Sequence, residues 1–268
     1  MKTKTYVYRS YDEDFVQTAD QGYTLPDDYS WNDPACLGRV ERAKSSLAYG
    51  IGLVFGWIYA RVVLHARFEN RASLETLRDL RKFPLGCMLF CNHTQPLGDP
   101  FLPALAAYPR RVWAVVSSSN LAIPGLGKLL PRLGALPIPE TPSKMREFNR
   151  AVSERLSRGD CVVVYPEAHV WPYCTFIRPF PPISFGFAVS NQVPVFSMTA
   201  TYQSRPGRAR PCMTLFLDGP FAPEPGTPRS RQKQSLCAQV RDAMEARSAE
   251  NTQAYIEYRR MEETEARA

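Results

Sequence analysis

The chain has 268 residues, of which 44% are hydrophobic and 22% charged. This composition is typical of a globular protein that can build one large core, and it excludes a disordered or fibrous chain. The net charge of +7 suits an anionic membrane surface or a phosphorylated substrate. The basic and aromatic residues form no stacking platform and no recognition helix, so no nucleic acid is expected as a partner.

The first 37 residues are acidic, with seven acidic and three basic side chains. Pro26 and Pro34 interrupt this segment. We therefore predict an extended or loosely packed N-terminal arm over residues 1–37.

Residues 38–82 are basic and contain the most apolar stretch, Leu47 to Leu64. Its 18 residues fall just short of the about 20 that a spanning helix needs. Three interpretations are open: a short spanning helix, a helix inserted into one leaflet, and a buried core helix. The basic residues just before the stretch, Arg39, Arg42 and Lys44, favour insertion into one leaflet. Residues 38–82 are predicted to be a membrane-associating helical segment.

Strand and helix patterns alternate over residues 83–228. Apolar runs rich in β-forming residues predict strands over 86–91, 112–117, 161–165, 193–200 and 212–217. A helix is predicted between Thr141 and Gly159. This alternation predicts an α/β domain with a mixed, largely parallel sheet flanked by helices. Residues 229–268 are predicted to be a C-terminal helical segment that includes Tyr255 to Tyr258.

The seven cysteines form no CxxC pair. Their odd number and apolar surroundings predict reduced, mostly buried thiols in a cytosol-facing protein. Cys87, Cys91 and His93 would share one face of a strand, but no fourth ligand lies nearby in the sequence. We therefore predict no metal site.

One of the three histidines, His93, follows the strand predicted over 86–91, and Asp99 comes six residues later. Ligands of α/β sheets gather at the carboxyl ends of strands. An imidazole oriented by a carboxylate is a general base, and it needs no serine when the nucleophile is a hydroxyl of the substrate. The two residues form a candidate catalytic dyad, although a lone histidine at a strand end is often structural.

The surroundings of His93 resemble the glycerolipid acyltransferase family, which includes lysophosphatidate and glycerol-phosphate acyltransferases. The first block of that family is Asn-His, four residues and Asp, and here it is similar to Asn92 to Phe101. Three further segments follow in family order and resemble the later blocks: Gly125 to Pro139, Val162 to Pro172 and Val193 to Tyr202. The resemblance covers roughly residues 85–217.

The resemblance implies an O-acyltransferase of phospholipid biosynthesis, associated with the cytoplasmic face of a membrane. Such an enzyme moves a fatty acyl chain from a thioester, acyl-CoA or acyl carrier protein, to a hydroxyl of a lysophospholipid or glycerol-phosphate acceptor. It implies no cofactor and no metal. By position, His93 is the catalytic base and Asp99 orients it. The residues implied to contact the acceptor are Asn92, Tyr165, Pro166 and Glu167.

The sequence departs from the family pattern in two ways. Five residues separate His93 from Asp99 instead of four, and Gly98 could accommodate the extra one. Pro139 and Val170 stand where the family has arginines that hold the acceptor phosphate. We predict that Arg178 binds this phosphate instead, because a guanidinium can bind phosphate through two parallel hydrogen bonds.

These departures leave two alternatives to an acyltransferase. One is a catalytically inactive, lipid-binding protein of the same fold. The other is a hydrolase that activates water with His93 and Asp99.

Overall fold

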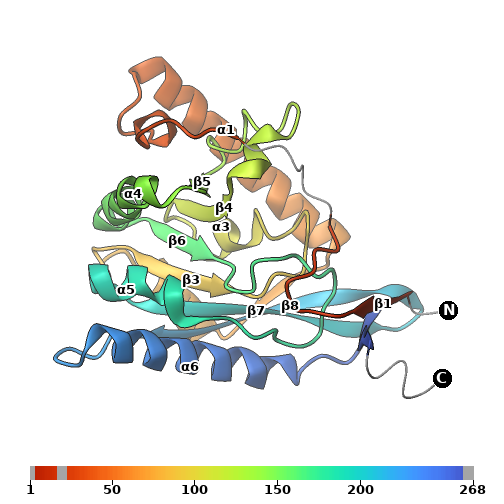
Figure 1. The fold of residues 1–268 in the computed structure, drawn as a ribbon. Coiled ribbons are helices and arrows are strands. Elements are labelled where there is room, and N and C mark those ends of the chain that lie inside the picture. The colour runs from red at the N-terminus through yellow and green to blue at the C-terminus, as the bar shows by residue number, and fades with distance from the viewer. Residues whose placement is uncertain (1–3, 17–22, 262–268) are drawn as a thin grey trace.

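The computed structural model describes residues 4–16 and 23–261. Its centre is a seven-stranded sheet (Figure 1). In spatial order the strands are β2 (Arg67–Glu69), β8 (Arg208–Phe221), β7 (Val195–Arg205), β3 (Cys87–Cys91), β6 (Cys161–Val164), β4 (Val112–Ser117) and β5 (Ala135–Ile138). All neighbouring pairs are parallel except β7 and β8. The prediction of a mixed, largely parallel sheet is therefore confirmed.

Helices cover both faces of this sheet. One face packs against α1 (Arg39–Ile58), α2 (Arg71–Arg78) and α3 (Leu102–Ala107), and the other against α4 (Met145–Ser157), α5 (Gly186–Asn191) and α6 (Arg229–Ser248). Successive residues of β3 alternate between the two cores: Leu89 and Cys91 belong to the first, Met88 and Phe90 to the second. A strand buried on both faces has no polar side, which explains its continuous apolar sequence.

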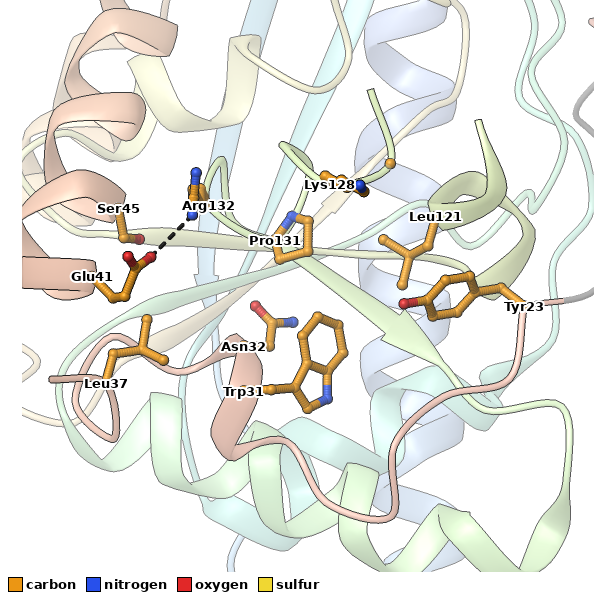
Figure 2. Close-up of a pocket in the computed structure, with 11 residues that line it drawn as sticks. Tyr23, Trp31, Asn32, Leu37, Glu41, Ser45, Leu121, Lys128, Pro131 and Arg132 are labelled. Carbon is orange, nitrogen blue, oxygen red and sulfur yellow. Dashed lines mark hydrogen bonds and ion pairs between the residues drawn. The ribbon is translucent and has the colours of Figure 1, made fainter. Parts of the chain in front are cut away.

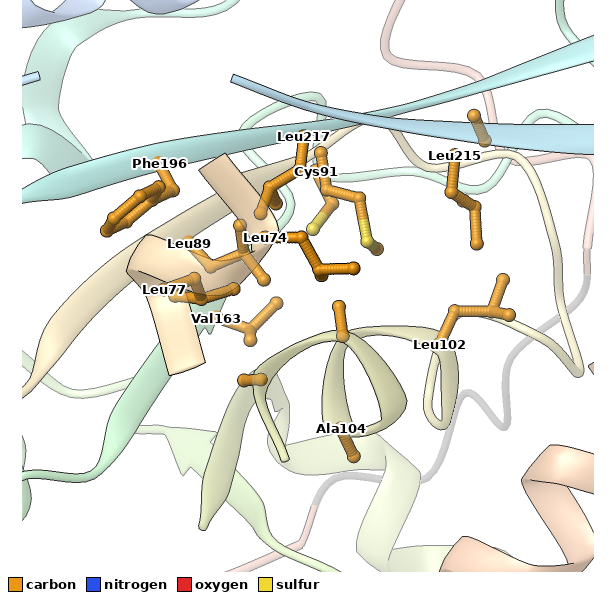
Figure 3. Close-up of a cluster of buried hydrophobic side chains, with 14 of the residues drawn as sticks. Leu74, Leu77, Leu89, Cys91, Leu102, Ala104, Val163, Phe196, Leu215 and Leu217 are labelled. Carbon is orange, nitrogen blue, oxygen red and sulfur yellow. The ribbon is translucent and has the colours of Figure 1, made fainter. Parts of the chain in front are cut away.

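The first core lies beneath the loop that carries His93 and Asp99. Figure 3 shows side chains from α2 and α3 meeting those of β3, β6, β7 and β8. Leu77, Leu89 and Leu215 are completely buried in it. This packing fixes the end of β3 relative to the start of α3.

The structure differs from the sequence predictions at both chain ends. Tyr255 to Tyr258 are not helical, because Ile256–Arg260 forms strand β9, which pairs in parallel with β1 (Lys4–Tyr8). In the N-terminal arm, Lys4–Tyr8 is extended, as one of the two predicted alternatives has it, but the ring of Tyr8 is buried against Trp171, so this end of the arm is not loosely packed. The rest of the arm and of the C-terminal segment lies outside the described residues.

Helix α1 continues through a π-helical turn, Tyr59–Val63. Together they form a 25-residue helix that is long and apolar enough to cross a membrane. Only 11% of its most apolar stretch is buried, so the interpretation as a core helix is wrong. One side of the helix packs on the domain, and large apolar side chains of another side are exposed: Val40, Leu47, Ile51, Val54, Trp57, Ile58 and Val62. This exposed side is a candidate membrane-associating surface.

Two glycines allow α1 to approach the start of α3. A Cβ atom on Gly56 would lie 2.6 Å from the Cβ of Phe101, and one on Gly52 would lie 2.7 Å from Cδ2 of Leu133. A Cβ atom on Gly50, in the same helix, would have no neighbour within 4 Å. The helix therefore rests directly on the residue that follows Asp99 by two positions.

These contacts predict opposite effects for two alanine substitutions in α1. Gly50→Ala should stabilise the fold by up to about 1 kcal/mol, because alanine is the better helix former. Gly56→Ala should destabilise it by about 1–3 kcal/mol, because the added methyl group overpacks against Phe101. Urea unfolding of the two variants measures the difference. Equal effects would show that α1 does not pack on Phe101 as described.

Candidate active site

His93 lies just beyond the carboxyl end of β3, two residues after Cys91. Its backbone N–H donates to the Glu167 carboxylate at 3.0 Å, and its carbonyl accepts from the N–H of Trp171 at 3.0 Å. Its ring stacks on Tyr165, with 4.2 Å between ring centroids. The side chain is still 19% exposed. The histidine is thus fixed on several sides but remains open to a reactant.

Asp99 orients this imidazole. Its Oδ2 lies 2.7 Å from Nδ1 of His93 and also accepts the backbone N–H groups of Thr94 and Gln95 at 3.0 and 2.9 Å. With a carboxylate at Nδ1, this nitrogen carries the proton and Nε2 is left as the basic atom. The structure thus brings the predicted dyad together.

The additional residue between His93 and Asp99 is taken up in a turn. The N–H of Asp99 donates to the carbonyl of Gln95 at 2.9 Å. Gly98 does not use a left-handed φ here. A Cβ at this position would lie 3.0 Å from Leu64 and 3.2 Å from Leu102, so glycine is favoured by close packing rather than by conformation.

Tyr165 supports the dyad. Its hydroxyl donates to the carbonyl of Asp99 at 2.6 Å. Burial, together with the nearby Asp99 carboxylate, raises the pKa of the Tyr165 phenol well above its usual value, so this hydroxyl stays protonated and keeps donating. A contact of Tyr165 with the acceptor remains a prediction.

The side chain of Arg178 is buried and paired, so it does not offer the predicted contact to a phosphate. Its side chain is 1% exposed and its guanidinium binds the Glu167 carboxylate at 3.0 Å. The same guanidinium donates to the carbonyl of His169 and lies over the ring of Trp171. The arginine is engaged inside the protein, which argues against the prediction that it binds an acceptor phosphate.

Glu167 is equally engaged. One carboxylate oxygen accepts the N–H of Arg178 at 2.8 Å, and the other accepts the N–H of His93 and the guanidinium of Arg178. This buried ion pair joins the segment after β6 to the peptide of His93. The structure therefore gives Glu167 a positioning role in place of the predicted contact with the acceptor.

Asn92 and Pro166 complete the predicted set. The Asn92 amide donates to the carbonyl of Ala200 at 3.0 Å and accepts its N–H at 2.8 Å, so this buried side chain joins the end of β3 to β7. Pro166 is half-buried between Tyr165 and Glu167. A role of either residue in binding the acceptor remains untested.

Ala168 follows Glu167 with a φ of +63°. An alanine in the left-handed region costs about 1–2 kcal/mol. The sharp turn is nevertheless kept, and it allows both Glu167 and His169 to contact Arg178.

Sequence reasoning missed the groups that hold the loop after His93. The hydroxyl of Tyr202 lies 2.7 Å from that of Thr94 and accepts the amide of Gln95 at 3.0 Å. Tyr202 is buried and comes from β7, more than a hundred residues later. The sequence signal that could have indicated this role is that Tyr202 lies in the segment resembling the fourth block of the family. Within residues 4–16 and 23–261, no group of three or more His, Cys, Asp or Glu side chains could hold a metal ion.

Comparison with known proteins agrees with this geometry. A family model described as Acyltransferase matches residues 68–201, which is half of the chain. The fold is similar to the crystal structure of the 1-acyl-sn-glycerophosphate (LPA) acyltransferase PlsC from Thermotoga maritima, with a TM-score of 0.52 and 16% sequence identity over 82% of this chain and 88% of that one. No curated protein matches the sequence. The chain belongs to the Acyltransferase family.

The burial of Arg178 predicts a loss of stability when it is replaced. Arg178→Met should lower the free energy of unfolding by about 3–5 kcal/mol, because it leaves the Glu167 carboxylate buried without its partner. The double variant Glu167→Gln/Arg178→Met should recover part of this loss. Arg259→Met, which breaks the exposed pair with Glu257, is the control and should change little. Unchanged stability with a raised KM for a phosphorylated acceptor would instead support the original prediction for Arg178.

Proposed function

We propose that this acyltransferase moves a fatty acyl chain from an acyl thioester to a free hydroxyl of a lysophospholipid or glycerol-phosphate acceptor. The observation that carries the proposal is the 2.7 Å contact between His93 Nδ1 and Asp99 Oδ2 in a loop held at the end of β3. PlsC, which has a similar fold, is a 1-acyl-sn-glycerophosphate acyltransferase. A lipid acceptor also fits the exposed apolar side of α1.

The chemistry requires one base and no covalent enzyme intermediate. Nε2 of His93 takes the proton of the acceptor hydroxyl as its oxygen attacks the thioester carbonyl. The tetrahedral oxyanion collapses, the carbon–sulfur bond breaks, and the imidazolium returns the proton to the departing thiolate. The products are an ester and a free thiol. Asp99 stabilises the transient imidazolium and keeps the ring in one orientation.

The assembled dyad favours catalysis over an inactive lipid-binding protein. A degenerate site would not be expected to keep three donors on one oxygen of Asp99. A hydrolase remains the second candidate, because the same base can activate water. The nature of the product separates the two functions, since a hydrolase releases a free fatty acid and a transferase forms a new lipid ester.

The packing of α1 supports insertion into one leaflet. Gly52 and Gly56 are held against the α/β domain. Tyr49, earlier in the helix, accepts the N–H of Val112 at 3.0 Å. A helix bound to the domain along its length cannot cross a bilayer without drawing the domain into it. We infer that its exposed side enters the membrane while the domain stays at the surface, on the cytoplasmic face.

The donor thioester and the acceptor phosphate are the remaining parts of the proposal. Acyl-CoA and acyl carrier protein both present the required thioester, and the chemistry needs no cofactor.

Because Arg178 is engaged inside the protein, we assign the contact with the acceptor phosphate to another basic residue, Arg210 of β8. Burial raises the pKa of the Tyr59 phenol, as do Tyr173 and Asp99, whereas the charge of Arg210 lowers it. Arg210 is exposed, and its charge and that of Asp99 act on the same tyrosine.

Replacing the dyad should abolish most of the transfer. His93→Ala should lower kcat by at least about 10², the low end for a general base, while thioester binding is retained. Asp99→Asn should also lower kcat strongly, because an amide can stabilise the wrong imidazole tautomer. The measurement is transfer of a labelled acyl chain to a panel of lysolipids. His65→Asn, which changes an exposed histidine, is the control. Near wild-type transfer by folded His93→Ala would refute the mechanism.

Replacing Arg210 should affect acceptor binding. Arg210→Ala should raise the KM for a phosphorylated acceptor about tenfold or more and leave kcat nearly unchanged, since a charge-assisted contact is lost. Arg208→Ala, two residues earlier in β8, is the matched control. Equal KM values for the two variants would remove Arg210 from the acceptor site.

A further inference from the structure

A pocket lies apart from the dyad, at the N-terminal end of α1. It has a volume of about 360 Å³, within the range of small-molecule sites. Figure 2 shows that its walls come from the N-terminal arm, from α1 and from the segment before β5. Glu41, in its wall, precedes Gly56 by four helical turns, which is about 22 Å along the axis. Since Gly56 packs on Phe101 near Asp99, the pocket and the dyad are separate sites.

Two residues of the pocket lining, Trp31 and Asn32, each have a buried polar atom without a hydrogen-bond partner among the described residues. Asn32 is 3% exposed, and its amide nitrogen donates to the carbonyl of Ala135 at 2.8 Å. That bond fixes the orientation of the amide, and Oδ1 has no hydrogen-bond partner among the described residues. Figure 2 shows the amide of Asn32 in the middle of the lining side chains. Buried polar atoms are rarely left unpaired, so Oδ1 indicates a ligand that donates a hydrogen bond.

The opposite wall of the pocket is basic. Lys128 is exposed, and within the described part of the chain it forms no ion pair and no side-chain hydrogen bond. Arg132 binds Glu41 at 3.0 Å, and this side chain is still 44% exposed. Glu41 is the acidic residue of the pocket, but Lys44 also pairs with it, at 2.7 Å. The charge left for a ligand is therefore positive.

The remaining lining combines the hydroxyl groups of Tyr23 and Ser45 with apolar groups. The ring of Trp31 and the side chains of Leu37, Leu121 and Pro131 line the pocket. On the same turns of α1, Val40 and Leu47 are exposed, at 68% and 66%. A ligand here would combine a negative charge, a hydrogen-bond donor and apolar chains.

We propose that this pocket binds a phosphate ester that carries a hydroxyl group, as in the headgroup of an anionic glycerophospholipid. The phosphate would contact Lys128 and Arg132, and the hydroxyl would donate to Oδ1 of Asn32. The acyl chains would lie along the exposed side of α1. The site would then hold the first turns of α1 at the depth of the lipid headgroups and favour membranes with anionic, hydroxyl-bearing lipids.

Binding of the full chain to vesicles tests the proposal. Phosphatidylglycerol has both the charge and the hydroxyl, whereas phosphatidylcholine has no net charge and no donor. We expect tighter binding to vesicles that contain phosphatidylglycerol, and Lys128→Ala should reduce this preference about tenfold. Arg231→Ala removes one exposed charge from α6, on the opposite face of the sheet, and should leave the preference unchanged.

A second variant and soluble competitors make the test specific. Leu37→Trp should fill the pocket and abolish the preference without removing a charge or a hydrogen bond. Soluble glycerophosphoglycerol should compete with the vesicles, and inorganic phosphate should compete less well. Equal competition by inorganic phosphate would overturn the headgroup assignment in favour of free phosphate. If the Lys128→Ala and Leu37→Trp variants prefer phosphatidylglycerol vesicles as strongly as Arg231→Ala does, the pocket is not the binding site. None of these outcomes depends on acyl transfer.

Discussion

The carboxylate of Asp99 is the group on which the active site depends. A single oxygen receives the ring of His93 and the backbone N–H groups of Thr94 and Gln95. Hydrogen bonds to a charged acceptor are about twice as strong as neutral ones, and here they are largely shielded from water. The loop after β3 therefore folds around this oxygen, and the imidazole direction follows from the loop conformation. This explains how a sequence with one additional residue between His and Asp keeps the two in contact.

A second carboxylate fixes the same histidine from its other side. Glu167 accepts the backbone N–H of His93, and the buried guanidinium of Arg178 neutralises its charge. Two segments far apart in the sequence are thus joined at the peptide of His93. Such a pair contributes little net stability compared with apolar packing, but it tolerates few alternative arrangements. Arg178 therefore holds Glu167, and through it the peptide of His93, in place.

The sequence predicted what depends on local pattern. The apolar runs located the five main strands, and the four motif blocks located His93 and Asp99. Contacts between segments far apart in the sequence were harder to predict. Arg178 is buried because Glu167 and Trp171 surround its side chain. The residues next to it in the sequence do not indicate this burial. Strand β9 was predicted as helix because its pairing partner, β1, lies some 250 residues earlier. The hydrogen bonds of Tyr202 with Thr94 and Gln95 were not predicted for the same reason.

Helix α1 connects the apolar surface to the chemistry. Its glycines rest on Phe101, which follows Asp99 by two residues, and the chain after the helix enters the core at Leu64. Because close packing resists small displacements, the helix and the catalytic loop must move together. If the exposed side of α1 lies in a leaflet, the depth of the helix sets the height of His93 above the lipid. A membrane-embedded acceptor can then present its hydroxyl to Nε2 without leaving the bilayer.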